Sequence, residues 1–217
     1  MRNLNPIKLI PAREMVASRL REAILLRELK EGDEITLEDI ANQLNVSITP
    51  VREAFLELEA DSFIKRRPNK SAIVLGITKK SIFDHYEVRA ILEREAAALA
   101  CSNDADISRI VEVFETADEI LKNGDEVDYT DYNHMFHMEI WKASRNERIT
   151  SILLSLWNGL SMGVRITEKE YSQISHNEHA AIVDAIKNRD ADKARELMNS
   201  HIIRSRDNIL TRFEELK

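Results

Sequence analysis

The chain has 217 residues and a net charge of −7, and it contains no run of the roughly 18 consecutive apolar residues that a membrane span needs. The first eleven residues show no cleavable signal pattern, so we expect a cytoplasmic protein with no membrane partner. Cys101 is the only cysteine, which excludes an intramolecular disulfide and a CxxC metal site.

Charge and composition divide the chain into two parts. Residues 1–75 contain 12 basic and 12 acidic side chains, whereas residues 76–217 contain 19 and 26 and therefore carry the whole net charge. All four prolines precede residue 69, and all six histidines follow residue 84. Because proline interrupts helices, the long proline-free remainder predicts successive helices. We therefore predict two domains, over residues 1–75 and 79–217.

The first domain is predicted to begin with three helices. Apolar residues at helical spacing predict an amphipathic helix over about residues 12–29. Thr36 can cap a second helix over Leu37–Leu44, and a tight turn at Asn45–Ser47 separates it from a third helix with Pro50 in its first turn. Two short helices joined by a turn of this length are typical of a helix-turn-helix.

The third helix has an outward face that offers Ser47, Thr49 and Arg52. In a helix-turn-helix, residues near the start of the second helix of the pair reach the base edges. Two short strands follow, at 63–66 and 72–75, joined by a loop rich in cations. Such a hairpin is suited to lie along a phosphate backbone. The alternative to DNA binding is a structural three-helix cap with a solvated basic loop.

Particular runs in this region resemble the DNA-binding domain of the GntR family of repressors. The runs are Ser47-Ile48-Thr49-Pro50-Val51-Arg52-Glu53-Ala54, Leu58-Glu59-Ala60-Asp61-Ser62-Phe63-Ile64 and Arg66-Arg67-Pro68-Asn69. The resemblance implies that residues 47–49 and Arg52 contact the operator, with Arg66, Arg67 and Lys70 in the wing. Ile48 replaces the arginine usual in the family, so it cannot pair bidentately with a guanine, and the operator sequence is expected to differ.

The second domain is predicted to be a bundle of six antiparallel helices. The predicted helices cover about 78–100, 103–121, 126–143, 147–166, 172–188 and 190–210. On the first of them, Val88, Leu92, Ala96 and Leu99 form the apolar stripe expected to face the core. The fold class is therefore mainly α, with a winged helix-turn-helix before the bundle.

Three histidines on three different helices are predicted to point into this bundle. His137 shares an apolar face with Asn133, four residues earlier, while His179 and His201 lie on apolar stripes of their own. Nitrogen and oxygen ligands from facing helices are how bundles build metal sites, and this set suits Zn²⁺, Ni²⁺ or Mn²⁺. The alternative is that these are hydrogen-bonded core histidines. His134 and His176, three residues before His137 and His179, complicate the choice of ligands.

Further runs are similar to the ligand domain of the FadR-type branch of the GntR family, also called the FCD domain. They are Val88-Arg89-Ala90-Ile91-Leu92-Glu93, Phe136-His137, Ala143-Ser144-Arg145-Asn146 and Glu178-His179-Ala180-Ala181-Ile182-Val183-Asp184-Ala185-Ile186. The resemblance implies a divalent metal ion whose ligands are Asn133, His137, His179 and His201. Asn133 stands where the family has aspartate.

Arg89 is the candidate to clamp the carboxylate of an effector, since a guanidinium binds that group in two places. Its alternative is an i, i+4 ion pair with Glu93. Together these features predict a homodimeric, non-enzymatic transcriptional repressor that binds a palindromic DNA operator. The resemblance implies that its effector is a small organic acid. A metal-dependent enzyme and a metal-free helical interaction module are the alternatives.

Overall fold

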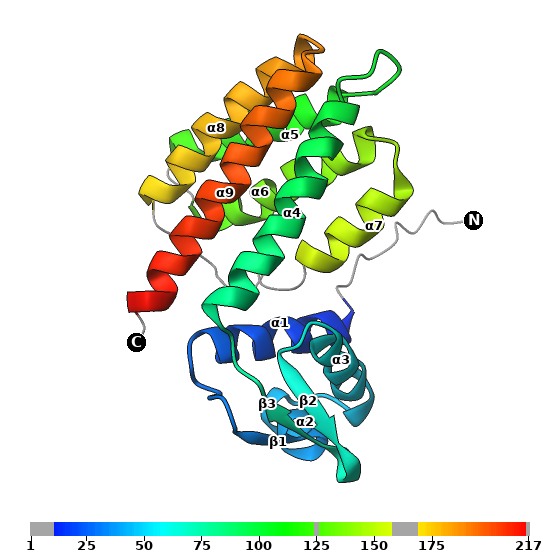
Figure 1. Cartoon of the computed structure of the whole chain (residues 1–217), viewed down its shortest axis with the longest axis vertical. Helices are drawn as coiled ribbons and strands as arrows, with labels where there is room; N and C mark the ends of the chain where they lie inside the picture. The colour runs from blue at the N-terminus through cyan, green and yellow to red at the C-terminus, as the bar shows by residue number, and fades with distance from the viewer. Residues whose placement is uncertain (1–10, 124–125, 158–168, 216–217) are drawn as a thin grey trace, which may run out of the picture. The chain divides into compact units, whose positions relative to one another are not determined.

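The computed structural model describes residues 11–123, 126–157 and 169–215 (Figure 1). These residues form two compact units, one over 11–77 and one that combines 78–157 with 169–215. None of the described helices is long and apolar enough to cross a membrane.

The first unit combines three helices with a small antiparallel sheet. Its elements are α1 (Ala12–Leu25), β1 (Glu34–Thr36), α2 (Leu37–Leu44), α3 (Ile48–Ala60), β2 (Ile64–Arg67), the 3-10 turn η1 (Pro68–Lys70) and β3 (Ser71–Val74). The strand order is β1-β3-β2, and Ala72 of β3 is paired with Ile35 on one side and Arg66 on the other. The predicted hairpin is therefore present, and β1 extends it by one strand.

Local signals in the sequence explain where α2 and α3 begin. The Thr36 side chain accepts a hydrogen bond from the Asp39 backbone N–H (3.1 Å) and so caps α2. Asn45 ends α2 in the left-handed conformation (φ 52°), which asparagine tolerates better than most residues, and so turns the chain toward α3. The buried face of α3, with Val51, Phe55 and Leu58, packs against α1.

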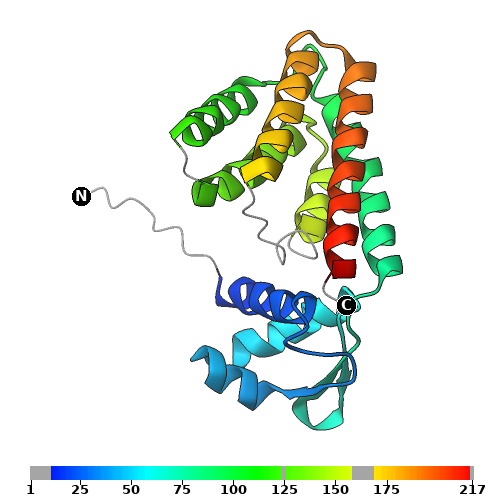
Figure 2. The same ribbon diagram turned by 90° about the vertical axis from the view of Figure 1, so that its left-hand side faces the viewer.

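The second unit contains the helices α4 (Lys79–Leu99), α5 (Ser108–Asn123), α6 (Glu126–Ala143), α7 (Glu147–Leu156), α8 (Lys169–Lys187) and α9 (Ala191–Glu215). Figures 1 and 2 show α4 and α9 side by side and running in opposite directions. These two helices form the most extensive helix–helix contact in the unit. The mainly helical fold class is confirmed. The predicted helix over 147–166 is represented by α7, and its continuation over 158–166 lies outside the described residues.

The face of α4 that packs into the unit differs from the predicted stripe. Val88 and Leu99 are 47% and 42% exposed, so of the four predicted core residues only Ala96 is fully buried. The buried face instead carries Arg89 and Glu93, which pair with each other. Apolar periodicity failed here because two charged side chains that satisfy each other inside the unit replace apolar residues on that face.

A short segment joins β3 to α4. The Thr78 side chain accepts a hydrogen bond from the Ser81 backbone N–H (3.0 Å), and the Ser81 hydroxyl accepts one from the Thr78 N–H, so a capping box starts α4. Gly76 has a left-handed φ of 73°, and a Cβ at that position would lie 3.2 Å from Cβ of Glu31. A larger residue would therefore be strained in this segment.

Candidate nucleic-acid interface and metal centre

Helix α3 presents its first turn to solvent. Ser47 precedes α3 in an extended conformation, and its side chain makes no capping hydrogen bond to that helix. Ser47, Thr49 and Arg52 are all exposed, and no ion pair involves Arg52 within the described residues. These polar groups are consequently available to base edges or phosphates.

A buried arginine fixes α3 to α1. Arg21 is 1% exposed and donates hydrogen bonds from Nη2 to Glu57 Oε1 (2.6 Å) and Asp61 Oδ2 (2.9 Å). Its guanidinium carbon lies 6.0 Å from the centroid of the Phe63 ring. The C-terminal half of α3 is thus held by charge-assisted hydrogen bonds as well as by apolar packing. This pairing was not predicted from the sequence, because Arg21 and its two carboxylates are more than 35 residues apart.

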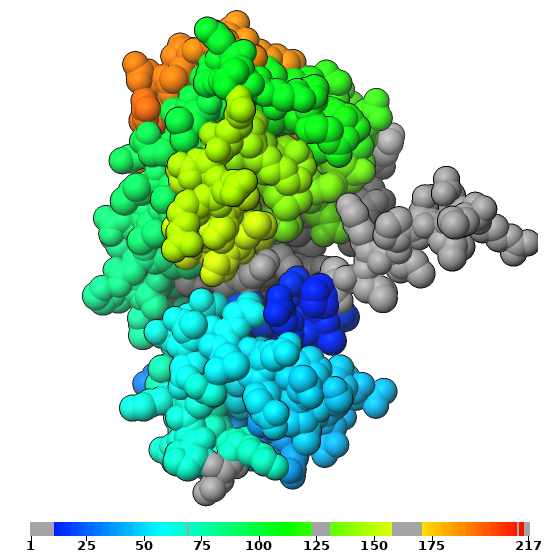
Figure 3. Space-filling model, turned by 90° about the vertical axis from the view of Figure 1, so that its right-hand side faces the viewer, coloured from blue at the N-terminus to red at the C-terminus, as the bar shows by residue number. Residues whose placement is uncertain are grey.

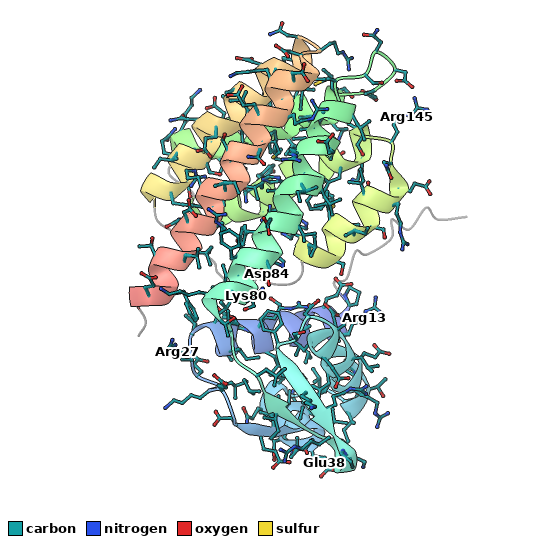
Figure 4. All side chains as sticks on the ribbon, in the orientation of Figure 1. Arg13, Arg27, Glu38, Lys80, Asp84 and Arg145 are labelled. Atoms are coloured by element: carbon teal, nitrogen blue, oxygen red, sulfur yellow. The ribbon has the colours of Figure 1, made fainter. Side chains whose placement is uncertain are left out.

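The predicted wing cations differ in how they are paired. Arg66 donates from Nε to Glu59 Oε2 (2.6 Å) and from its backbone N–H to Glu59 Oε1 (2.8 Å). These hydrogen bonds lower the pKa of Glu59. Nζ of Lys70 lies 3.8 Å from Oε1 of Glu38. Figure 4 labels Glu38 at the hairpin end of the unit. Arg67 is exposed and forms no ion pair with any described residue.

Three imidazoles from three helices meet inside the second unit. His137 of α6, His179 of α8 and His201 of α9 are each at most 3% exposed. The Nε2 atom of His201 lies 3.2 Å from Nε2 of His137 and 3.3 Å from Nε2 of His179. Two imidazole nitrogens that bind one metal ion at ~2.1 Å lie about 3.0–3.4 Å apart, so these separations fit a shared ion. We call these three residues the histidine triad.

Carboxylates fix the proton on two of the triad rings. Nδ1 of His137 lies 2.9 Å from Glu93 Oε2, and Nδ1 of His201 lies 2.6 Å from Glu178 Oε2. An ionised carboxylate can only accept a hydrogen bond, so each Nδ1 carries the hydrogen and each Nε2 presents a lone pair. Two lone pairs that face each other at 3.2 Å repel unless a cation lies between them.

Burial keeps the triad neutral. It lowers the pKa of His137, lowers that of His179 well below its ordinary value, and lowers that of His201 to about 4. Burial opposes the ionisation of Glu93 as well, but the attraction of His137 and Arg89 outweighs it and lowers the pKa of Glu93 to about 2. At neutral pH the triad therefore offers unprotonated nitrogens, the form that binds metals.

Asn133 lies one turn before His137 on α6. Its Oδ1 atom is buried and has no hydrogen-bond partner within the described part of the chain. Residues four apart share a helix face, so this oxygen belongs to the face that carries His137. A buried carbonyl oxygen without a partner is costly, and coordination of a cation would satisfy it. The three triad nitrogens therefore fit a divalent metal ion, and Asn133 stays a predicted oxygen ligand.

The other histidines lie apart from the triad. His176 donates from Nε2 to Asp118 Oδ1 (3.1 Å) and stacks on Phe114 (centroids 4.6 Å apart). His134 stacks on Trp157 with centroids 4.8 Å apart. Among the described residues, only the triad has His, Cys or carboxylate atoms close enough together to hold a metal.

Arg89 is buried and forms the i, i+4 pair with Glu93, from Nε to Oε1 (2.9 Å). Its guanidinium carbon lies 4.2 Å from the centroid of Trp157, within range of a cation–π interaction. Trp141 donates from Nε1 to the same Glu93 side chain (2.8 Å). Sequence reasoning missed Glu93, Glu178 and both tryptophans as neighbours of the triad; the i, i+4 spacing of Arg89 and Glu93 was the only local signal.

Comparison with known proteins decides the family. The family model for "Bacterial regulatory proteins, gntR family" matches residues 12–74, and the FCD domain model matches residues 84–204, which is more than half of the chain. The chain belongs to the GntR family. It is thus a DNA-binding transcriptional regulator with an FCD effector-binding domain, and the enzyme alternative is discarded.

Two named relatives of this GntR chain match nearly its whole length. The gluconate operon transcriptional repressor of Bacillus subtilis is 30% identical over 218 residues, covering 93% of this chain and 84% of the relative. A D-xylose utilization operon repressor of Paenarthrobacter nicotinovorans is 30% identical over 200 residues, covering 88% and 87%. The solved structure of Escherichia coli McbR shares the fold, with a TM-score of 0.71 at 21% identity, and covers 94% of this chain and 100% of McbR.

The match places both sites inside the expected domains of a GntR regulator. Helices α2 and α3 and the hairpin lie within residues 12–74, and the histidine triad lies within residues 84–204. The triad could therefore hold a metal in the part of the chain that binds effectors. The resemblance to the GntR and FCD families is confirmed, while the roles of individual residues stay predictions.

Proposed function

We propose that this GntR regulator is a homodimeric repressor whose operator binding responds to a small carboxylate, bound beside a divalent metal ion in the histidine triad. The observation that carries the metal is the pair of lone pairs, on His137 and His201, that face each other at 3.2 Å. The triad and Asn133 supply four neutral ligand atoms, which suits Zn²⁺, Ni²⁺ or Mn²⁺ with positions open to an anion.

The charge of the site supports an anionic effector. Three neutral imidazoles and one amide leave the charge of a divalent ion uncompensated by its own ligands. Arg89 is buried on α4 and pairs through Nε with Glu93, so it would add hydrogen-bond donors rather than net charge. The gluconate operon repressor is named for a sugar acid. Sugar acids are therefore the first effectors to screen, and we propose Arg89 as a contact for their carboxylate.

For DNA, we propose that Ser47, Thr49 and Arg52 enter the major groove. The wing cations Arg66, Arg67 and Lys70 would then lie along the phosphates. Exposure of all six residues supports this assignment. One recognition helix from each subunit would read each half of a palindrome, with half-sites one helical turn or ~34 Å apart.

An exposed apolar stripe on α4 supports the homodimer. Val88, Ile91 and Leu99 are each more than 40% exposed and lie on one side of α4. Ile152 on the neighbouring α7 is 36% exposed, and Figure 3 shows α4 and α7 on the same face of the helical unit. We propose that this stripe is the dimer contact. We also propose that residues 1–75 and 79–217 are the functional domains and that the protein works in the cytoplasm.

Metal binding can be tested through the two tryptophans of the chain. Both flank His137, with ring centroids 5.1 Å (Trp157) and 6.4 Å (Trp141) away. Titration of chelator-treated protein with Ni²⁺ should quench their fluorescence at one equivalent, and Zn²⁺ should raise the melting temperature. His179→Ala should abolish both effects. A chelator-treated protein that binds no divalent metal would overturn the proposal.

DNA binding can be tested on the upstream region of the gene. Arg52→Ala should abolish recognition of the operator without changing the circular dichroism spectrum. Arg13→Ala, on the exposed side of α1, is the matched control and should bind as wild type does. Unchanged binding by Arg52→Ala would remove the recognition-helix assignment.

A further inference from the structure

An arginine and a glutamate stand behind one ring of the histidine triad. Arg204 of α9 donates from Nε to Glu178 Oε1 (2.6 Å), and the other oxygen of Glu178 accepts from Nδ1 of His201 (2.6 Å). The Arg204 guanidinium is braced by the Tyr171 ring, whose centroid lies 4.9 Å away. His201 then directs Nε2 into the triad.

The same arrangement stands behind a second ring. Arg89 of α4 donates from Nε to Glu93 Oε1 (2.9 Å), and Glu93 Oε2 accepts from Nδ1 of His137 (2.9 Å). This guanidinium is braced by Trp157, with its carbon 4.2 Å from the ring centroid. In both cases one carboxylate oxygen binds arginine Nε and the other binds the imidazole. We call these two sets of residues the Arg–Glu–His relays.

The two relays arise from unrelated parts of the chain. In the relay to His137, Glu93 is four residues after its arginine on α4, whereas in the relay to His201, Glu178 and Arg204 lie on different helices. The geometry therefore does not follow from a repeated sequence motif. His179, the third triad residue, contacts no carboxylate within the described part of the chain and stacks on Phe136 (centroids 4.1 Å apart).

We infer that Glu93 and Glu178 are positioning residues that hold His137 and His201 in the tautomer with a free Nε2, and that Arg89 and Arg204 keep these carboxylates in place. This inference rests on the proposed metal site. Each glutamate fixes both the proton and the ring orientation of its histidine before any ion arrives. Carboxylates behind ligand histidines commonly strengthen metal binding by about 10–100-fold.

The arginines explain how the buried Glu93 and the half-buried Glu178 can serve this purpose without changing the charge of the site. Each glutamate is neutralised by its own arginine, so the relays add no net charge next to the metal. An unpaired carboxylate would instead partly offset the charge of the ion and weaken its attraction for an anionic effector. The relays therefore orient the ligands and leave the ion free to attract an anion.

The first experiment measures the tautomers in the metal-free protein. Long-range ¹⁵N–¹H NMR spectra of histidine-labelled protein report which ring nitrogen carries the proton. We expect His137 and His201 to be protonated at Nδ1 in the wild type. In Glu178→Gln the amide N–H₂ can turn toward His201 and donate to Nδ1, so His201 should shift toward the Nε2–H form while His137 does not. Unchanged His201 signals in Glu178→Gln would overturn the inference.

The second experiment measures Zn²⁺ affinity by competition with a chromophoric chelator. Glu178→Gln and Glu178→Ala should each bind Zn²⁺ about 10–100-fold more weakly than the wild type. Asp184→Asn changes an exposed carboxylate on the same helix and should bind Zn²⁺ as the wild type does. Arg204→Met should cause a smaller loss than Glu178→Ala, because the glutamate still reaches His201.

The outcomes separate the two proposals. If wild-type protein binds no Zn²⁺ but its tautomers are as expected, the proposed metal site is contradicted and the positioning role of the glutamates is supported. If wild-type protein binds Zn²⁺ and Glu178→Ala binds it equally well, the positioning role falls and the metal site stands.

Discussion

At the scale of single residues, Asn133 has the clearest chemical consequence. As a ligand of the proposed metal site it would bring an oxygen but no charge, in a position where related FCD domains are expected to have aspartate. Its Oδ1 atom is buried without a hydrogen-bond partner among the described residues, and coordination of a cation would satisfy it. Compared with an aspartate, this neutral ligand should lower the affinity for the metal ion and raise the affinity of the bound ion for an anion.

Asn133→Asp should therefore tighten divalent metal binding by about tenfold or more, equal to ~1.4 kcal/mol, and weaken the binding of a sugar acid. Chelator competition measures the first effect, and calorimetric titration of the metal-loaded protein with gluconate measures the second. Asn177→Asp, at an exposed position on α8, is the control. Equal metal affinity in wild type and Asn133→Asp would place residue 133 outside the ligand set.

His201 should make the metal-free protein sensitive to mild acid. Its pKa is about 4 in the folded state and ~6.5 when unfolded, so between these values the unfolded chain binds more protons. The stability contributed by the neutral ring is complete above pH 6.5 and is lost as the pH falls toward 4. At ~1.4 kcal/mol per unit of pKa, the loss should reach roughly 3 kcal/mol.

Urea denaturation of the metal-free protein at pH 7, 6 and 5 measures this loss. His201→Gln removes the titrating group, so its free energy of unfolding should change less over the same range. A wild-type protein that is equally stable at pH 7 and pH 5 would contradict the assignment of a neutral, buried His201.

At the scale of elements, the sequence predicted the order of helices and the hairpin but not every face or edge. The strand β1 (Glu34–Thr36) was missed because three residues are too few to show an alternating pattern. On α4, the apolar stripe was assigned to the core although Val88 and Leu99 are exposed. Periodicity identifies a face of a helix, but it does not say whether the protein itself or a second copy covers that face.

The histidine triad shows the same division between local and long-range information. His137, His179 and His201 were predicted because each lies on an apolar stripe of its own helix. Glu178 was not assigned a role, because its contacts with His201 and Arg204 join helices that only the tertiary fold brings together. Buried ion pairs across helices leave no periodic signal.

The contact between α3 and the wing should limit DNA affinity. Glu59 accepts two hydrogen bonds from Arg66 and so competes with phosphate for that cation. Glu59→Gln should raise the affinity for nonspecific DNA and steepen the dependence of log K on log salt by about 0.9, the value for one added phosphate contact. Fluorescence anisotropy at several salt concentrations measures both quantities.

Glu22→Gln provides a matched control, because Glu22 pairs with Arg19 on the surface of α1. Its affinity and salt dependence should equal those of the wild type. If Glu59→Gln binds DNA more weakly with an unchanged slope, Glu59 serves to hold the wing in place and does not compete for Arg66.

At the scale of the whole molecule, the proposed repressor would need two copies to read a palindromic operator. The exposed stripe on α4 is the surface that a second copy is proposed to cover. Ile91→Glu places a charge in the middle of this stripe and should shift the protein from dimer to monomer, as measured by sedimentation equilibrium. Operator affinity should fall as the dimer dissociates.

Leu26→Glu is the control for this change, since Leu26 is 50% exposed but lies in the DNA-binding unit. It should remain dimeric. A dimer that withstands both Ile91→Glu and Val88→Glu would place the interface on another face of the helical unit.

The short segment between β3 and α4 has a consequence for how a signal can travel. Only residues 75–78 separate the two elements, so at ~3.5 Å per residue the tether reaches about 14 Å at most. We propose that a connection this short couples a movement of α4 to the adjoining strand β3. Insertion of a flexible Gly-Ser stretch after Ile77 should leave DNA binding and ligand binding intact yet silence the communication between them.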